Sequence, residues 1–431
     1  LEFLGQRPIW PVRALIGHTV ASTACAAVAA YFWTGSAENV MARWGGATRR
    51  PRGKVLVRIV SVAVGTAAIV ILAFAVSRKN PTKTNANPLD TPPDTMATQH
   101  YRFTYPRPFR LRVQRLAAQA DALCERGAAA LKADCPAKIS VDLTRASDTH
   151  AGSAALGTIR IDLTAHLDEA TLERTLAHET VHTLVAAQTR GRALDAGALR
   201  FFDEGLAEFV ALKLLPDEAT ARARVFRTVL ARQRLNIGLD VITDYERLRR
   251  TADQDLVYDF GLTWLNALVV TCGQGAPAAV VLALSRTDKN GLDGTAFWRD
   301  TLRKAGCGWD AVAAQWNLMQ DAELGRLKGE LDRVPDLVGS VARRDADSVE
   351  VVGRLEGTPP PDAAYRLRLR DNDSEPESRY RTFVGEVTSD GAVHFEIQRY
   401  EISGERFQFQ LGLQWSSLGT TLTHFERWQD G

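Results

Sequence analysis

The spacing of hydrophobic and polar residues changes twice along the chain. A run without charged residues extends from Ile59 to Val76, within an apolar stretch at 55–76 whose one charge is Arg58. Apolar residues then recur at helical spacing over much of 111–331. From about 336 onward apolar and polar residues alternate, as in strands with one buried face. The pattern therefore predicts an apolar N-terminal region, a largely helical part and a β part.

The stretch at 55–76 is long enough to cross the hydrocarbon core of a membrane as a helix. It has no polar face, whereas the core helix of a soluble domain usually has one. A weaker apolar stretch at 15–33 is a candidate second span or an interfacial helix. We therefore interpret residues 1–80 as a membrane-anchoring region.

Basic residues around the stretch at 55–76 predict its orientation. They are denser before it than after it: Arg49, Arg50, Arg52 and Lys54 precede it, and Arg78, Lys79 and Lys83 follow. The more basic flank of a span usually stays in the cytoplasm. Residues after about 80 are therefore expected on the extracytoplasmic side, which is periplasmic or extracellular.

Three parts are predicted after the anchor. Residues 81–100 are rich in Pro, Thr and Asn, and we interpret them as a linker. In 101–335 short strands precede long helical patterns, which predicts an α+β domain. Residues 336–431 are expected to form a small antiparallel β domain, similar to a sandwich. The alternation is clearest where Tyr365, Leu367 and Leu369 are interleaved with Arg366, Arg368 and Arg370.

Composition and charge narrow the classes of function. The formal net charge is +2, so there is no electrostatic case for a nucleic-acid partner. None of the five cysteines forms a CxxC pair, which argues against a cysteine-based zinc site. If the region is exported, the local pairs Cys124–Cys135 and Cys272–Cys307 are predicted disulfides. Free buried thiols are the alternative.

The segment LERTLAHETVHTLVAAQ carries the most specific chemical signal. His178 and His182 are four residues apart in a helical pattern, so both imidazoles project from one face. Two neutral ring nitrogens so placed can bind one zinc ion at about 2.0–2.1 Å. Glu179 then lies beside the first ligand as a candidate general base, which is the HExxH pattern. The alternative is two histidines on a helix face that pack or contact solvent.

A second segment, FFDEGLAEF, supplies candidates for the rest of the site. Zinc needs a third protein ligand, and Glu204 follows His182 after a turn-rich stretch that allows an antiparallel return. Glu208 is one helical turn further on and is expected to accept the free N–H of a ligand imidazole. Asp203 is interpreted as a cap of this second helix rather than as a metal ligand.

Together, AHETVHTL and FFDEGLAEF resemble the gluzincin clan of zinc metallopeptidases, which includes thermolysin and the aminopeptidase N-like enzymes. The similarity is greatest to bacterial peptidase-MA-like domains in which an EGLAE segment follows HExxH. It covers about 101–320 and implies a thermolysin-like fold, with Glu204 as third ligand and Glu208 as partner of a ligand histidine. There is no GxMEN-type exopeptidase segment, so the resemblance does not extend to aminopeptidase activity.

The resemblance also implies two features outside the motifs. The segment Thr158–Leu163 is similar to the edge strand that pairs with extended substrate in the clan. Tyr258 matches a tyrosine that donates to the tetrahedral intermediate in some relatives, with an ordinary packed aromatic as the alternative.

These observations predict a membrane-anchored zinc metallopeptidase with one zinc ion per chain and a peptide or protein substrate. Glu179 would take a proton from the attacking water and pass it to the leaving amine. The alternative is a catalytically silent, zinc-stabilised binding module at the cell envelope, whose β domain recognises a protein or glycan partner. Glu179 favours the enzyme, because a purely structural zinc site does not need it.

Overall fold

The computed structural model describes residues 91–144, 152–164, 168–191, 197–286, 294–344, 348–360, 362–371, 381–387, 392–398 and 407–431. The chain divides into two compact units, Leu1–Asn87 and Pro88–Gly431, and all described residues belong to the second. The apolar stretches at 15–33 and 55–76 therefore lie outside the described residues. Among the described helices, no single one is long and apolar enough to cross a membrane. Only the helices Leu256–Cys272 and Ala276–Leu284 taken together, with a bend of 107° between them, have that length and composition.

A five-stranded sheet opens the second unit, with its strands in the order β1-β2-β3-β5-β4. The central strands β2, β3 and β5 run parallel, and the outer strands β1 and β4 are antiparallel to their neighbours. Tyr101, Phe103 and Tyr105 alternate with more exposed residues along β2 and are buried. The strands are β1 (Pro93–Ala97), β2 (Tyr101–Pro106), β3 (Ile139–Asp142), β4 (Gly152–Ala155) and β5 (Thr158–Ile161).

Two expectations about this sheet are wrong. Strand β1 falls inside 81–100, the expected linker, because Pro93–Ala97 pairs with β2 and its Met96 packs against the core. Strand β4, and not the segment Thr158–Leu163, forms the edge next to β5. The sequence of β4 is Gly-Ser-Ala-Ala, which lacks the β-branched and aromatic residues that indicate a strand.

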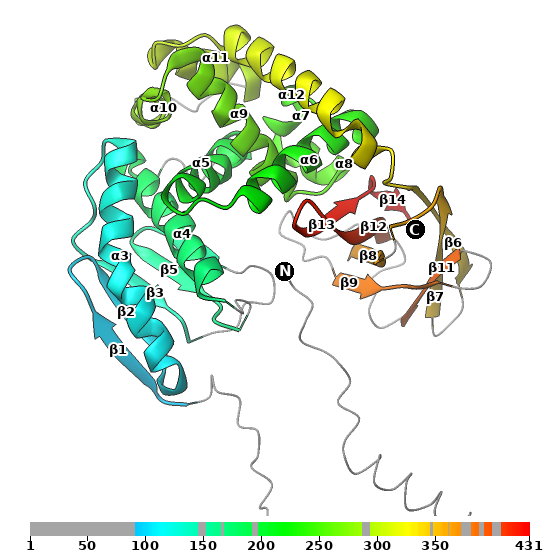
Figure 1. Cartoon of the computed structure of the whole chain (residues 1–431), viewed down its shortest axis with the longest axis horizontal. Helices are drawn as coiled ribbons and strands as arrows, with labels where there is room; N and C mark the ends of the chain where they lie inside the picture. The colour runs from blue at the N-terminus through cyan, green and yellow to red at the C-terminus, as the bar shows by residue number, and fades with distance from the viewer. Residues whose placement is uncertain are drawn as a thin grey trace, which may run out of the picture. The chain divides into compact units, whose positions relative to one another are not determined.

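Helices α3 (Arg110–Leu131) and α4 (Glu169–Thr189) cover the sheet and pack against each other (Figure 1). Helix α4 begins where the Asp168 side chain accepts the N–H of Thr171, and it ends at Arg190 in the left-handed conformation. The other helical elements are η2 (Arg107–Phe109), η4 (Gly197–Leu199), α5 (Arg200–Leu214), α6 (Glu218–Leu235), α7 (Leu239–Ile242), α8 (Tyr245–Thr251), α9 (Leu256–Cys272), α10 (Ala276–Leu284), α11 (Gly294–Lys304) and α12 (Trp309–Leu331).

Two glycines let helices α5 and α9 touch through their backbones. A Cβ atom on Gly205 would lie 2.3 Å from the carbonyl carbon of Gly261, and one on Gly261 would lie 2.0 Å from the carbonyl oxygen of Phe201. Larger residues at either position would push the helices apart. This contact brings the start of α9, with Tyr258, close to the start of α5.

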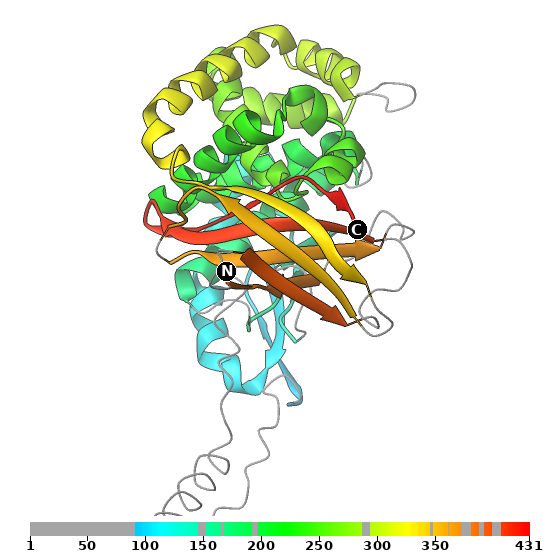
Figure 2. The same cartoon turned by 90° about the vertical axis from the view of Figure 1, so that its right-hand side faces the viewer.

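The C-terminal strands form two antiparallel sheets around a shared core (Figure 2, yellow to red). One sheet has the order β10-β11-β7-β6, and the other has the order β13-β12-β8-β9 with β14 paired to β12. The predicted α+β class is therefore confirmed, as a chain that combines helices with antiparallel sheets. The strands are β6 (Asp336–Arg344), β7 (Ser348–Glu356), β8 (Ala364–Asp371), β9 (Arg381–Val384), β10 (Glu386–Val387), β11 (Ala392–Gln398), β12 (Phe407–Ser417), β13 (Thr420–Phe425) and β14 (Gln429–Asp430).

The core of this sandwich continues onto two helices. Phe226 and Leu230 of α6 and Leu331 of α12 belong to the same buried cluster as the inward-facing residues of the strands. The rings of Phe226 and Trp415 lie 6.1 Å apart between centroids. Helix α6 is therefore packed by residues that lie far later in the chain.

The polar face of β8 is a contact surface. Arg368 Nη1 lies 2.6 Å from Asp253 Oδ1, and Arg370 donates to the Arg249 carbonyl oxygen at 2.6 Å. Two of the three arginines that alternate with apolar residues in β8 therefore hold the sandwich against the region around α8.

Both predicted disulfides are present. Cys124 pairs with Cys135, and Cys272 pairs with Cys307, with Cα–Cα distances of 5.8 and 6.0 Å. These separations are within the usual range for a disulfide. The alternative of free thiols is therefore wrong for these four residues.

Candidate metal centre

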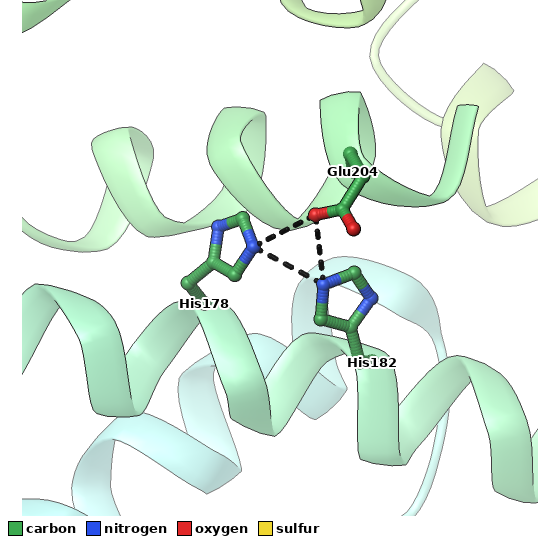
Figure 3. Close-up of side chains that lie close together, drawn as sticks. All are labelled: His178, His182 and Glu204. Atoms are coloured by element: carbon green, nitrogen blue, oxygen red, sulfur yellow. Dashed lines mark hydrogen bonds and ion pairs between the residues drawn. The ribbon is translucent and has the colours of Figure 1, made fainter. Parts of the chain in front are cut away.

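Three side chains from two helices converge on one point (Figure 3). His178 and His182 project from α4, and Glu204 projects from α5. The two Nε2 atoms are 3.1 Å apart, and Glu204 Oε2 is 3.2 Å from each. The side chains are only 12%, 8% and 4% exposed, respectively. Three potential ligand atoms therefore form a nearly regular triangle shielded from water.

The partners of the imidazoles make this triangle suitable for a cation. Nδ1 of His178 lies 3.4 Å from Glu208 Oε2, and Nδ1 of His182 lies 2.9 Å from Asp203 Oδ2. A carboxylate beside each Nδ1 favours a ring proton there, which leaves the Nε2 lone pairs facing each other and Glu204. Three electron-rich atoms at such distances repel one another unless a proton or a metal ion lies between them.

The size of the triangle also fits zinc. Ligand atoms about 2.0–2.1 Å from a tetrahedral ion are about 3.3–3.4 Å apart. The observed separations of 3.1–3.2 Å are close to that value. Two imidazoles and a carboxylate are also a donor set that zinc accepts while keeping a further position open. His178, His182 and Glu204 therefore could hold a metal ion, and the HExxH pattern fits the two histidines.

The electrostatics of the ligands favour positive charge. Burial lowers the pKa of His178, but hydrogen bonds to Glu204 and Glu208 outweigh it and raise the pKa to about 9. Burial alone would raise the pKa of Glu204, but His182 and Arg200 hold it well below its usual range. The site therefore carries negative potential that a proton or a metal ion can neutralise.

Glu179 follows His178 on α4 and faces strand β4. Glu179 is 6% exposed, and burial raises the pKa of its carboxyl group. A Cβ atom on Gly152 of β4 would lie 2.6 Å from Glu179 Oε1. The edge strand therefore passes directly over the candidate base, and a glycine makes that approach possible.

Asp203 differs from its expected role. The N-cap of α5 is Leu199, which makes no side-chain capping bond, and Asp203 lies one turn inside the helix. Its carboxylate faces His182 and is buried, so it is placed to orient that imidazole and does not cap the helix. An acidic residue between Phe202 and Glu204 on an apolar helix needs a buried partner, which is the signal that could have identified it.

Tyr258 reaches the same site from α9. Its ring centroid is 5.9 Å from that of His178. Burial, and then the nearby Glu204 carboxylate, raises the pKa of Tyr258 well above its ordinary value. The phenol therefore keeps its proton and remains a hydrogen-bond donor.

Two arginines that sequence reasoning missed border the site. Arg200 Nη2 lies 2.7 Å from Glu204 Oε1, the oxygen that faces away from the histidines. Its i,i+4 spacing from Glu204 on a helix was an available signal. Arg224 Nε lies 3.2 Å from Glu208 Oε1, and no local pattern indicates it. The structure thus brings together all six predicted residues, whose roles stay predictions: His178, Glu179, His182, Glu204, Glu208 and Tyr258.

Comparisons with known proteins add little to this geometry. No protein-family model matches the sequence, and no curated protein matches it. Among solved structures, similarity is found to an aminopeptidase N family protein from Idiomarina loihiensis, with a TM-score of 0.37 and 8% identity. The alignment covers 79% of this chain and 67% of that chain. A similarity of this size does not define the activity of this chain.

Proposed function

We propose that this protein is a zinc-dependent metallopeptidase of the gluzincin type. The observation that carries the proposal is the triangle of His178 Nε2, His182 Nε2 and Glu204 Oε2. The Glu179 carboxyl group is close enough for all three of these side chains to affect its pKa. These three side chains would hold the ion. Bound zinc would supply Lewis acidity, which lowers the pKa of water and polarises a carbonyl group.

The surrounding residues suit the proton transfers of peptide hydrolysis. Glu179, with a raised pKa, would accept a proton from the attacking water and return it to the leaving amine. Tyr258, which keeps its phenolic proton, would donate a hydrogen bond to the developing oxyanion. Asp203 and Glu208 would keep the two imidazoles oriented.

The substrate would bind along strand β4. An extended peptide can add a strand to an open sheet edge through main-chain hydrogen bonds. Strand β4 is the outer strand on that side of the sheet, and its Gly152 is adjacent to Glu179. This role therefore moves from Thr158–Leu163, where the sequence suggested it, to Gly152–Ala155.

The proposed location is the extracytoplasmic side of a membrane, with residues 1–80 as the anchor. The apolar run at 59–76 and its basic flank support the anchor. The two disulfides support an oxidising compartment for the rest of the chain. A reporter fused after residue 80 tests this topology, because cytoplasmic activity of the reporter would contradict it.

The decisive experiment combines metal analysis with digestion. The full chain, purified in detergent, should contain about one zinc ion per chain and should cut members of a diverse peptide library. His178→Ala and His182→Ala should remove the metal. Zinc without any cleavage would favour the catalytically silent binding module instead, and full metal occupancy in both variants would refute the site.

A further inference from the structure

Arg224 on helix α6 contacts two groups of the candidate centre at once. Its Nε lies 3.2 Å from Glu208 Oε1, and the other oxygen of Glu208 lies 3.4 Å from His178 Nδ1. Its guanidinium carbon lies 5.2 Å from the centroid of the Tyr258 ring. Its side chain is only 18% exposed. Only Glu208 therefore lies between Arg224 and the candidate ligand His178, and Arg224 also contacts Tyr258, the candidate oxyanion donor.

The contact with Glu208 determines how that carboxylate can orient His178. Glu208 is nearly buried, and its two oxygens are divided between His178 and Arg224. Removing the guanidinium would leave a buried carboxylate without its cation, which is strongly unfavourable. The carboxylate would then turn toward other donors or water. His178 would lose the partner that holds its ring, and such losses weaken metal binding.

The contact with Tyr258 acts on the other side of the site. A guanidinium over a phenol ring is attracted to the ring face. The Tyr258 ring in turn lies against His178. Arg224 also donates to Asp259 Oδ1 at 3.0 Å, which fixes the guanidinium relative to helix α9. The orientation of Tyr258 and that of Glu208 are thus set by the same planar group.

Arg227 provides a matched comparison within the same helix. It lies about one turn further along α6 and donates to the same oxygen, Asp259 Oδ1, at 2.7 Å. Its ion pair within the described part of the chain is with Asp259 alone. Replacing Arg227 therefore removes a partly buried charge from Asp259 without touching Glu208 or Tyr258.

We propose that Arg224 is a positioning residue of the metal centre, acting on His178 through Glu208 and directly on Tyr258. The inference rests on the proposed zinc site and extends it to a helix that carries none of the ligands. Zinc affinity and turnover should therefore both depend on α6.

The test uses the full chain in detergent with the variants Arg224→Gln, Arg224→Lys and Arg227→Gln. Zinc affinity is measured by competition with a chromophoric chelator, and thermal stability is measured in parallel. Arg224→Gln should weaken zinc binding about 10–100-fold, and Arg227→Gln should leave it unchanged. Arg224→Lys should restore part of the affinity, because an ammonium can pair with Glu208 but cannot also keep the planar contacts. Wild-type affinity in Arg224→Gln would overturn the proposal.

A double-variant cycle separates positioning from a general loss of stability. If Arg224 acts through Glu208, the loss of zinc affinity in Arg224→Gln should largely disappear in a Glu208→Gln background. At saturating zinc, any remaining loss of kcat should disappear in a Tyr258→Phe background. An equal loss in every background would overturn the proposal. If Arg224→Gln fails to fold, the Arg224→Lys variant is compared across the same backgrounds.

These outcomes distinguish the inference from the proposed function. Zinc affinity is measured without any substrate, so a wild type that binds zinc but cuts nothing still tests Arg224. A selective loss of affinity in Arg224→Gln would then support the inference while the peptidase proposal fails. Unchanged zinc affinity in Arg224→Gln, together with normal cleavage by the wild type, would overturn the inference and support the peptidase proposal.

Discussion

Gly152 of strand β4 and Glu179 of helix α4 are in such close contact that a Cβ atom on the glycine would lie 2.6 Å from Glu179 Oε1. It would also lie 2.9 Å from the Cγ2 atom of Thr175. Strand β4 and the Glu179 side chain therefore pack so closely that a larger residue at 152 would displace one of them.

Gly152→Ala should impair hydrolysis without removing the metal. The added methyl group would displace the Glu179 carboxylate or the strand, whereas none of the three candidate ligands, His178, His182 and Glu204, is among the side chains nearest to it. We expect a loss of kcat approaching the value for loss of the base, about 10²–10⁴-fold, with unchanged zinc content. Ser153→Ala, at the exposed neighbouring position, is the control. Normal turnover in Gly152→Ala would contradict the arrangement of strand and base.

Glu179→Gln and Glu204→Gln should separate the base from the ligand. Glu179→Gln should keep zinc and thermal stability and should lower hydrolysis about 10²–10⁴-fold. Glu204→Gln should weaken zinc binding as well as activity, because a neutral amide is a poorer ligand than a carboxylate. Metal analysis and peptide cleavage on the same preparations give the comparison. Equal zinc loss in both variants would mean that the roles are wrongly assigned.

Zinc binding should release protons at neutral pH. The pKa of His178 is about 9, because hydrogen bonds to Glu204 and Glu208 outweigh the opposing effect of burial. Below that pKa the metal must displace a proton from the imidazole. Apparent zinc affinity should therefore fall as pH falls, by about tenfold per pH unit for each proton released. Chelator competition across the pH range measures this slope, and a flat profile would argue against imidazole ligation.

Asp203→Ala should weaken zinc binding to a similar degree as Glu208→Ala, about 10–100-fold. Each carboxylate faces the Nδ1 atom of one ligand histidine. Each variant should leave Glu204 in place, so some zinc binding should remain. If Asp203→Ala lowered thermal stability but left zinc affinity unchanged, the proposed role of Asp203 in orienting His182 would be refuted.

Phe226→Ala should destabilise both the sandwich and the metal centre. The ring is buried between α6 and the strands, next to Trp415, and its removal should cost about 3–5 kcal/mol. Because α6 also carries Arg224, the temperatures of zinc release and of loss of β structure should both fall, and by a similar amount. Leu318→Ala, at a position 66% exposed on α12, is the control. Two separate transitions would show that the parts unfold independently.

The convergence of the candidate metal ligands could be predicted because its signal is local. His178 and His182 are one helical turn apart, so sequence spacing alone places them on one face. Glu204 and Glu208 required only the further assumption of an antiparallel helix. Helical periodicity and the alternation after 336 likewise predict the α+β class, since both depend on near neighbours in sequence.

The features that were missed depend on tertiary contacts. Strand β4 has small residues and weak strand propensity, so its place at the sheet edge comes from pairing with β5. Arg224 is 16 residues from Glu208, on a different helix, and its role arises where the two helices meet. The expected linker contains β1 because pairing with β2 outweighs a proline-rich composition.

The packing of α6 against the C-terminal strands also bears on the order of events during synthesis. The strands that bury Phe226 and its neighbours begin at Asp336, long after α6 ends at Leu235, so they leave the ribosome later than α6 does. Until these strands have folded, α6 lacks the apolar packing that they provide, and Arg224 has no fixed position beside Glu208. A nascent chain would thus carry all three ligands well before it could assemble a finished centre. We therefore expect the candidate centre to be completed only after the C-terminal strands have been synthesised.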